Sequence, residues 1–213
     1  KIYHYLQLFR QESNKPIVAY LDTVAASGGY YAALAANRII SHPTCITGSI
    51  GVIMSFFQLK DLLENKLGIK HIVIKSGQHK DLGSISRDLS EEERKILSGI
   101  IDEMYRRFLA VVKQGRPNLK VQQSELLKLA DGRIYTGKQA MNLGLIDAIG
   151  YRQKAVDQAC ELAQVAKGNY KLVRYQTPRS LFQELIKPGI GASRSPHQIV
   201  DSFLQRYATP RFY

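Results

Sequence analysis

The pattern of apolar and polar residues predicts that the chain opens with a helix followed by a strand, turn and helix unit. Residues 1–10 carry apolar side chains at helical spacing, which predicts an amphipathic helix. Residues 17–21 form a short apolar run typical of a buried strand that leads into a turn at Ser27. Small residues then predict a helix through Ala36.

The next stretch repeats this alternation of strand and helix. Residues 38–40 predict a short strand, and residues 45–53 predict an extended segment whose two glycines indicate close backbone approach. Residues 57–67 have helical spacing and end before a glycine, and residues 70–75 alternate as expected of a strand. This order of strands and helices is typical of an α/β protein.

A polar loop over residues 76–89 precedes the most strongly marked helix of the sequence. Ser90 and Glu93 have the spacing of a capping box, and helical periodicity continues to about Lys113. The apolar stripe on this helix predicts a face that packs in the core or against another subunit. Its members are Ile96, Leu97, Ile100, Ile101, Met104, Phe108 and Val111.

The remainder predicts a helix at 123–129, a strand, turn, helix and strand over 131–147, and a helix over 151–166. Residues 170–175 are strand-like, and prolines and glycines become frequent after them. We therefore expect a principal domain over residues 1–168 and a C-terminal extension over 169–213 that packs on a neighbouring subunit.

Composition narrows the classes of function. The 213 residues carry a net charge of +12, but the cationic side chains are spread along the chain without interleaved aromatics, so no nucleic-acid partner is expected. The two cysteines, Cys45 and Cys160, and the five histidines lack the spacing of a disulfide framework or metal site, so neither metal nor cofactor is expected. No apolar run reaches the roughly 18 to 20 residues of a membrane span.

Ser27 is the first candidate for chemistry. It precedes Gly28 and Gly29 at a predicted helix start, where free backbone N–H groups can hold the oxyanion of acyl transfer. Serine is also a common helix N-cap, and the Gly-x-Ser-x-Gly of α/β-hydrolases is absent. A nucleophilic serine needs a base, for which the residues offer His42, which precedes a proline in a turn, or Lys80, in the polar loop.

Four motifs in chain order resemble those of the signal peptide peptidase A family in its short, single-repeat form. They are Ala-Ala-Ser-Gly-Gly-Tyr-Tyr at 25–31, Thr-Gly-Ser-Ile-Gly-Val at 47–52, Ser-Gly-Gln-His-Lys-Asp at 76–81 and Asp-Gly-Arg-Ile-Tyr-Thr-Gly at 131–137. The resemblance implies a Clp protease and crotonase type of fold, built from repeated ββα units, and a Ser/Lys peptidase activity.

The resemblance also implies a role for each matching residue. Ser27 corresponds to the nucleophile, Lys80 to the general base and Ser49 to the serine that orients the lysine. The backbone N–H of Gly28 corresponds to one oxyanion donor. The family's second donor belongs to a first βα portion, which we expect upstream of Lys1 together with any membrane anchor.

The leading expectation is a serine endopeptidase that degrades hydrophobic peptides, chiefly remnant signal peptides, through an acyl-enzyme. The resemblance implies a homo-oligomer associated with a bacterial or organellar membrane, with its catalytic domain on the non-cytoplasmic side. A preference for small or apolar side chains fits Val52, Ile53, Phe56 and Phe57 near the site. The alternatives are a Clp-like Ser27/His42 peptidase, a noncatalytic oligomeric module of membrane quality control and, more weakly, a crotonase-type acyl-CoA enzyme.

Overall fold

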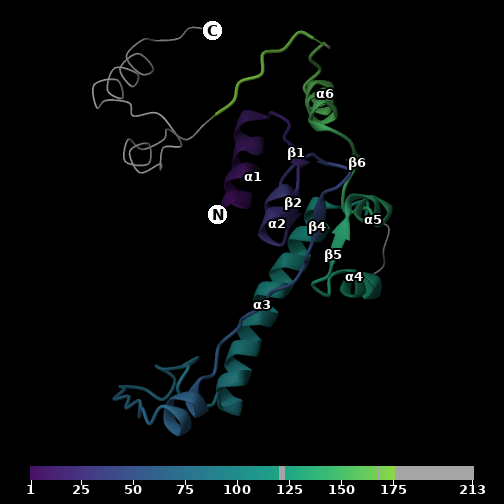
Figure 1. Ribbon diagram of the computed structural model, residues 1–213. Coiled ribbons are helices and arrows are strands. Elements are labelled where there is room, and N and C mark those ends of the chain that lie inside the picture. The colour runs from purple at the N-terminus through teal and green to yellow at the C-terminus, as the bar shows by residue number, and fades with distance from the viewer. Residues whose placement is uncertain (120–122, 167, 176–213) are drawn as a thin grey trace, which may run out of the picture. The chain divides into compact units, whose positions relative to one another are not determined.

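The computed structural model describes residues 1–119, 123–166 and 168–175. The chain divides after Tyr170, and the fold below is that of the first unit, Lys1–Tyr170. Its helices and strands are interspersed along the chain (Figure 1). In order they are α1 (Ile2–Ser13), β1 (Val18–Leu21), β2 (Val24–Ala26), α2 (Gly28–Ala33), β3 (Arg38–Ser41), β4 (Ile46–Gly48), η1 (Leu62–Lys66), α3 (Glu91–Gly115), α4 (Gln123–Leu129), β5 (Ile134–Thr136), α5 (Gly137–Asn142), β6 (Ala148–Ile149) and α6 (Arg152–Leu162).

The strands form two small sheets, and most of their pairings are parallel. The first sheet has the order β1-β3-β6, with both pairs parallel. The second has the order β2-β4-β5, in which β2 and β4 are parallel and β4 and β5 are antiparallel. The α/β class is therefore confirmed, because parallel neighbours joined through helices are its defining feature.

The N-terminal prediction is right in outline and wrong in one connection. The opening helix, the strand over residues 17–21 and the strand over 38–40 form as α1, β1 and β3. The strand that leads into Ser27 is β2, which belongs to the other sheet. The helix after Ser27 ends at Ala33, because Ala35 and Ala36 donate to carbonyls three residues back and so tighten the last turn.

Residues 54–89, which we call the arm, differ most from prediction. Within the expected helix over 57–67, regular helical structure begins only at Lys60 and continues as the π-helical turn η1. The expected strand over 70–75 does not form: Ile72 is 82% exposed and Ile74 is 98% exposed. A strand needs a hydrogen-bonding neighbour, and no described segment pairs with this one.

Helix α3 begins as predicted. The hydroxyl of Ser90 accepts from the N–H of Glu93, and the carboxylate of Glu93 accepts from the N–H of Ser90, which completes the capping box. The apolar stripe divides along the helix: its C-terminal part, with Phe108 and Val111, is buried in the core. In the N-terminal part, Leu97 is buried, but Ile96, Ile100 and Met104 are between 39% and 53% exposed, so burial explains only part of the stripe.

The C-terminal half follows the predicted order of elements. Helix α4, the β5–α5–β6 unit and helix α6 form, although β6 lies just beyond the predicted range of 131–147 and α6 ends at Leu162 rather than at residue 166. The expected strand over 170–175 does not form, since its residues have no paired neighbour among those described. The rest of the predicted extension, residues 176–213, lies outside the described residues.

An ion pair fixes the end of α3 to the first sheet. Two nitrogens of Arg116, just after α3, donate to the two carboxylate oxygens of Asp147 at 2.8 and 3.0 Å. The same carboxylate accepts from the N–H of Ile39 in β3 at 2.7 Å. Burial raises the pKa of Asp147, but these hydrogen bonds outweigh burial, so its pKa is lowered.

No helix among the described residues is both long and apolar enough to cross a membrane.

Candidate active site

Ser27 lies at a strained turn between β2 and α2. Its backbone has φ 51° and ψ −116°, a conformation that L-residues rarely adopt. Two hydrogen bonds hold it there: its N–H donates to the carbonyl of Gly48 at 2.8 Å, and its carbonyl accepts from the N–H of Tyr31 at 2.8 Å. Strain of this kind at an exposed serine between strand and helix is typical of a nucleophile turn.

The register of the second sheet brings Ser49 beside Ser27. Ala26 of β2 is paired with Gly48 of β4 in parallel, so the residues that follow them leave adjacent strand ends on the same side of the sheet. Ser49 has φ 50°, and its N–H donates to the carbonyl of Arg133 at 2.8 Å. Two predicted site residues, 22 positions apart in the sequence, therefore meet at one edge.

Gly48 makes this close approach possible. It has φ +85°, and a Cβ on it would lie 2.6 Å from Cδ2 of Tyr135 and 3.2 Å from the carbonyl oxygen of Arg133. Tyr135 cannot move freely, since its ring is buried and its hydroxyl donates to the carbonyl of Leu129 at 2.6 Å. Only glycine fits this position without displacing β5.

Ser27 and Ser49 open onto a cavity of about 770 Å³. Its walls come from the two serine turns, from the start of the sequence, from residue 132 and from the middle of α3. The lining residues are Lys1, Ser27, Gly28, Tyr31, Ser49, Gly51, Val52, Ile53, Glu103, Met104, Arg107, Phe108 and Gly132. Val52 and Ile53 lie at the site as expected, whereas Phe56 and Phe57 are not among the lining residues.

Gly28 supplies a backbone N–H at the mouth of this cavity. The first backbone hydrogen bond of the turn into α2 is donated by Tyr31, so the Gly28 N–H precedes the helical ladder. No heavy atom of the surroundings lies within 4 Å of where a Gly28 Cβ would be, which leaves room for a substrate. The turn can therefore present one donor to an oxyanion beside the Ser27 hydroxyl.

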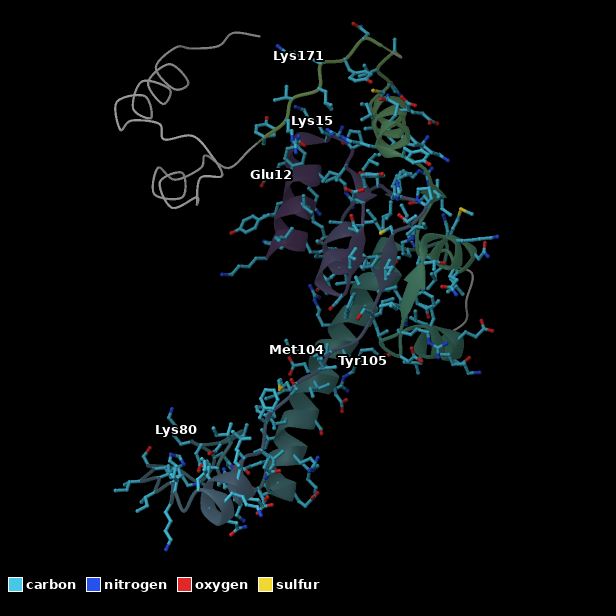
Figure 2. All side chains as sticks on the ribbon, viewed as in Figure 1. Glu12, Lys15, Lys80, Met104, Tyr105 and Lys171 are labelled. Atoms are coloured by element: carbon cyan, nitrogen blue, oxygen red, sulfur yellow. The ribbon has the colours of Figure 1, made fainter. Side chains whose placement is uncertain are left out.

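Lys80 does not join these residues within the chain. It lies on the arm, whose neighbouring residue His79 faces Glu92 and Glu93 in the first turn of α3, at 3.5 and 4.0 Å. The cavity instead meets α3 from Glu103 onward. From Glu93 to Glu103 the helix rises about 15 Å, and Figure 2 accordingly shows Lys80 far from Met104, which lines the cavity.

His42, the alternative base, is occupied within its own turn. Its Nδ1 lies 2.8 Å from the hydroxyl oxygen of Thr44 and 3.2 Å from the Thr44 backbone nitrogen. Its ring packs edge-on against Tyr151, with the ring centroids 5.3 Å apart. His42 is not among the residues that line the cavity.

Sequence reasoning missed the charged residues of the cavity wall. Lys1 lines the cavity, and Glu103 and Arg107 face it one turn apart on α3. Helical periodicity could have placed Glu103 and Arg107 beside Met104 and Phe108, which the apolar stripe had already marked. Nothing local in the sequence signals that Lys1 approaches residues 27 and 49.

Comparison with known proteins identifies the family of this chain. The model of peptidase family S49 matches residues 9–166, so the chain belongs to this family. A putative protease, slr0021, from Synechocystis is 39% identical over 181 residues, which cover 85% of this chain and 64% of that protein. A putative signal peptide peptidase SppA from Enterococcus faecium is 42% identical over 142 residues, covering 67% of this chain and 40% of that protein.

The chain thus spans between two-fifths and two-thirds of the length of these two relatives. Among solved structures, the membrane-bound stomatin-specific protease 1510-N in complex with a substrate peptide is similar, with 18% identity and a TM-score of 0.47. The match covers 86% of this chain and 74% of that one.

Proposed function

We propose that the protein is a serine endopeptidase that cleaves hydrophobic peptides, chiefly remnant signal peptides, through an acyl-enzyme. The observation that carries the proposal is the strained turn of Ser27, which opens beside Ser49 onto a cavity in a chain of peptidase family S49. The cavity wall is partly apolar, through Val52, Ile53 and Phe108, which suits small or apolar peptide side chains.

The proposed reaction assigns one step to each group. The Ser27 hydroxyl oxygen attacks the peptide carbonyl carbon while the neutral Lys80 amine takes the hydroxyl proton. The Gly28 N–H donates to the oxyanion that forms, and Ser49 orients the amine. Lys80 then gives the proton to the leaving nitrogen as the C–N bond breaks. Water attacks the resulting ester, Lys80 accepts a proton from it, and that proton returns to the Ser27 oxygen as the acid product leaves.

We further propose that Lys80 reaches Ser27 from a second copy of the chain. Within one chain the arm contacts the first turn of α3, whereas the Ser27 cavity lies further along that helix. Lys80 is exposed, and a lysine acts as a base only where burial or a neighbouring positive charge favours its neutral form. Docking of the arm on a neighbouring protomer would supply this burial, and the exposed Ile72 and Ile74 are suited to such a contact.

The base assignment is tested by turnover of an apolar fluorogenic peptide in the full-length protein. Lys80→Ala is expected to lose activity by at least about 10³-fold. Lys138→Ala is the matched control, because Lys138 is exposed on α5 and does not line the cavity. It is expected to retain most of the activity. Full activity in Lys80→Ala with loss in His42→Ala would favour the Ser/His alternative, and full activity in Ser27→Ala would exclude Ser27 chemistry.

Mixing two inactive variants tests the contribution of a second copy. Ser27→Ala and Lys80→Ala protomers are each expected to be inactive alone. When the two are mixed and allowed to exchange, sites that combine an intact Ser27 with an intact Lys80 should form and restore up to about a quarter to a half of the activity. If peptidase activity does not recover in mixtures whose subunits demonstrably exchange, the proposal that the active site is built from two protomers is contradicted.

We also propose association with a bacterial or organellar membrane through a segment upstream of Lys1, with the catalytic domain on the non-cytoplasmic side. A relative from Arabidopsis that is 35% identical over 183 residues is named a chloroplastic serine protease, which is consistent with an organellar setting for that protein. Fractionation of cells that express the full-length protein, followed by protease protection of intact vesicles, tests both parts of this proposal. Recovery of the protein in the soluble fraction would contradict it.

A further inference from the structure

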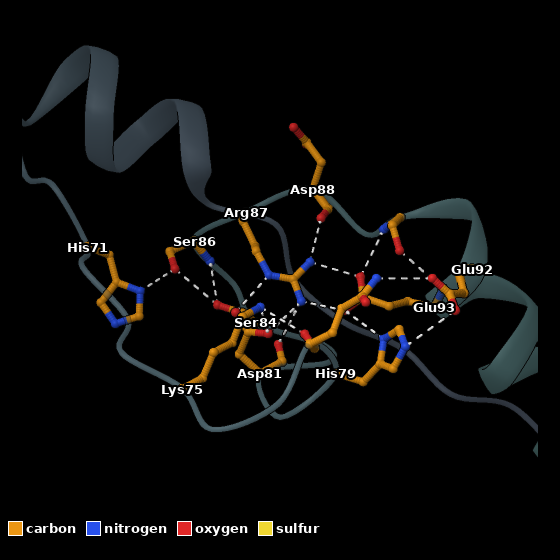
Figure 3. A network of polar contacts seen from close by, with 12 residues as sticks. His71, Lys75, His79, Asp81, Ser84, Ser86, Arg87, Asp88, Glu92 and Glu93 are labelled. Atoms are coloured by element: carbon orange, nitrogen blue, oxygen red, sulfur yellow. Dashed lines mark hydrogen bonds and ion pairs between the residues drawn. The ribbon is translucent and has the colours of Figure 1, made fainter.

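Arg87 is the centre of a polar network on the arm that the proposed reaction does not use directly. Figure 3 shows its guanidinium between Asp81 and Glu93. Nε donates to Asp81 at 2.8 Å, and Nη2 donates to both Asp81 and Glu93. Nη1 donates to Glu93 at 2.8 Å and to the carbonyl of Asp88 at 3.0 Å. All five N–H groups of the guanidinium therefore have an acceptor, which fixes its plane.

One end of this network is attached to the residue that follows Lys80. The Asp81 carboxylate accepts from Arg87 and also from the Lys75 ammonium, at 2.7 Å. The Lys75 ammonium donates in addition to the carbonyl of Gln78 at 2.8 Å. Hydrogen bonds from Arg87 and then from Lys75 hold the pKa of Asp81 well below its usual range, so the carboxylate stays charged at neutral pH. The loop from 75 to 81 is closed around this carboxylate.

The other end is attached to the start of α3. Glu93 is 2% exposed and is also the capping-box residue that accepts from the N–H of Ser90. A buried carboxylate is stable only when paired, and Arg87 provides the pairing. Arg87 thus connects the Lys80 loop to a 25-residue helix that lines the Ser27 cavity at its middle.

Lys80 is left free while its neighbours are held. The N–H of Lys80 donates to the carbonyl of Gly77 at 3.2 Å, and the N–H of Leu82 donates to the carbonyl of His79 at 3.1 Å. His79 itself faces Glu92 and Glu93. The Lys80 ammonium has no hydrogen bond or ion pair to any residue that the structure describes. The backbone is therefore held on both sides of Lys80, whereas its ammonium group remains free to contact another group.

We propose that Arg87 is a positioning residue, which acts through Asp81 to fix the backbone of Lys80 at the start of α3 and thereby sets where the amine is delivered. This role rests on the proposed function of Lys80 as general base. No strand supports the arm at this point, because residues 70–75 form none, and the other polar contacts of this loop with α3 are those of Gln78 and His79 with Glu92 and Glu93. A misplacement of about 1 Å at a reacting group can lower a rate by on the order of 100-fold. The loss of the Arg87 hydrogen bonds should therefore have a measurable effect on kcat.

The test compares variants of the full-length protein by kcat and KM for an apolar peptide as a function of pH. Arg87→Met is expected to lower kcat on the order of 10- to 100-fold and to change KM less than about twofold. The pH at which kcat rises should also shift. Arg87→Lys should recover only part, since an ammonium cannot donate as a bidentate fork to both carboxylates. Arg94→Met is the matched control, because Arg94 follows Glu93 in the first turn of α3 and, among the described residues, forms an ion pair only with the exposed Glu91, at 3.7 Å.

Asp81→Asn keeps the claim testable if Arg87→Met does not fold, because it retains the Arg87–Glu93 pair and removes only the charge beside Lys80. It is expected to lower kcat and to change the rate at which an amine-acylating reagent modifies Lys80, as measured by mass spectrometry. Values of kcat, pH profile and Lys80 labelling equal to those of Arg94→Met, in both Asp81→Asn and folded Arg87→Met, would overturn the positioning role.

A Lys80→Ala reference separates this proposal from the proposed function. If Lys80→Ala is inactive while Arg87→Met and Asp81→Asn are unaffected, only the positioning role fails. If Lys80→Ala retains full turnover, the assignment of the general base fails, and the positioning role fails with it. Loss of activity in Lys80→Ala, Arg87→Met and Asp81→Asn together, with Arg94→Met unaffected, supports both.

Discussion

Ser27 and Ser49 leave the C-terminal ends of two adjacent parallel strands with nearly the same left-handed φ, 51° and 50°. Each turn is held by a backbone hydrogen bond of 2.8 Å to a neighbouring strand or loop. Among the described residues, positive φ outside glycine otherwise occurs only at Asn14 and Gln164, which follow helix ends. The strain is therefore concentrated where the proposed chemistry takes place, as expected of a site whose geometry is set by its surroundings.

Removing the strain at Ser27 should stabilise the protein while abolishing turnover. Ser27→Gly is expected to be more stable than Ser27→Ala by about 1 kcal/mol, because glycine adopts a positive φ without a Cβ penalty. Ser98 on the exposed face of α3 is the control, where Gly should instead be less stable than Ala by about 1 kcal/mol. Urea unfolding of the four variants measures both differences. Equal stability of the two Ser27 variants would contradict strain at this turn.

The approach of β4 to β5 depends on Gly48. Gly48→Ala should destabilise the fold by about 2 kcal/mol or more, because its Cβ would overlap the Tyr135 ring and its φ is positive. It should also lower activity, since Ser49 follows directly. Gly99→Ala is the control, because no surrounding atom lies within 4 Å and alanine favours the helix. A Gly48→Ala protein as stable as Gly99→Ala would show that the packing around Gly48 is looser than described.

The stability contributed by Glu93 should depend on pH in the acid range. Hydrogen bonds from Arg87 and then from Ser90 lower the pKa of Glu93 to about 2, against about 4.3 in an unfolded chain. A lowered folded-state pKa gives stability that is present above about pH 4.3 and is lost as the pH falls toward 2. The gap in melting temperature between the unmodified protein and Glu93→Gln should therefore be constant from pH 7 to 5 and narrow below pH 4. A gap that stays the same down to pH 2.5 would contradict the assignment.

The pair between Arg116 and Asp147 should matter more than exposed ion pairs. Arg116→Met removes two charged hydrogen bonds to Asp147 and one to the Gly144 carbonyl, and we expect a loss of about 2 to 3 kcal/mol. The Arg133–Asp131 pair, with side chains 60% and 41% exposed, serves for comparison. Arg133→Met should cost less than about 1 kcal/mol. Urea unfolding measures the loss in free energy of unfolding for each variant. Similar losses for both would contradict the expectation that the Arg116–Asp147 pair contributes more than an exposed pair.

Local signals were sufficient where the determinants of structure are local. The Ser90 and Glu93 capping box fixed the start of α3, and the small residues after Ser27 marked α2. The strand expected over 70–75 failed because a β-strand depends on a partner that periodicity does not supply. The division of the α3 stripe into buried and exposed parts likewise depends on which elements reach each turn, which the stripe itself does not encode.

For the site, the motifs marked Ser27, Ser49 and Lys80, but their spacing did not reveal their arrangement. The contact between the two serine turns depends on the pairing of Ala26 with Gly48, a long-range register. The distance of Lys80 from Ser27 depends on how the arm is anchored to Glu92 and Glu93. Arg87 carried no motif, and only its contacts with two carboxylates from separate segments identify it.

The most direct test of the central claim is to identify the residue that a serine-directed fluorophosphonate modifies in the full-length protein. Digestion and mass spectrometry should find the adduct on the peptide that contains Ser27, in parallel with loss of peptidase activity. The adduct should be absent from Ser27→Ala and form much more slowly in Lys80→Ala. Inactivation with the adduct on another residue, or an active protein whose Ser27 is never modified, would contradict the account.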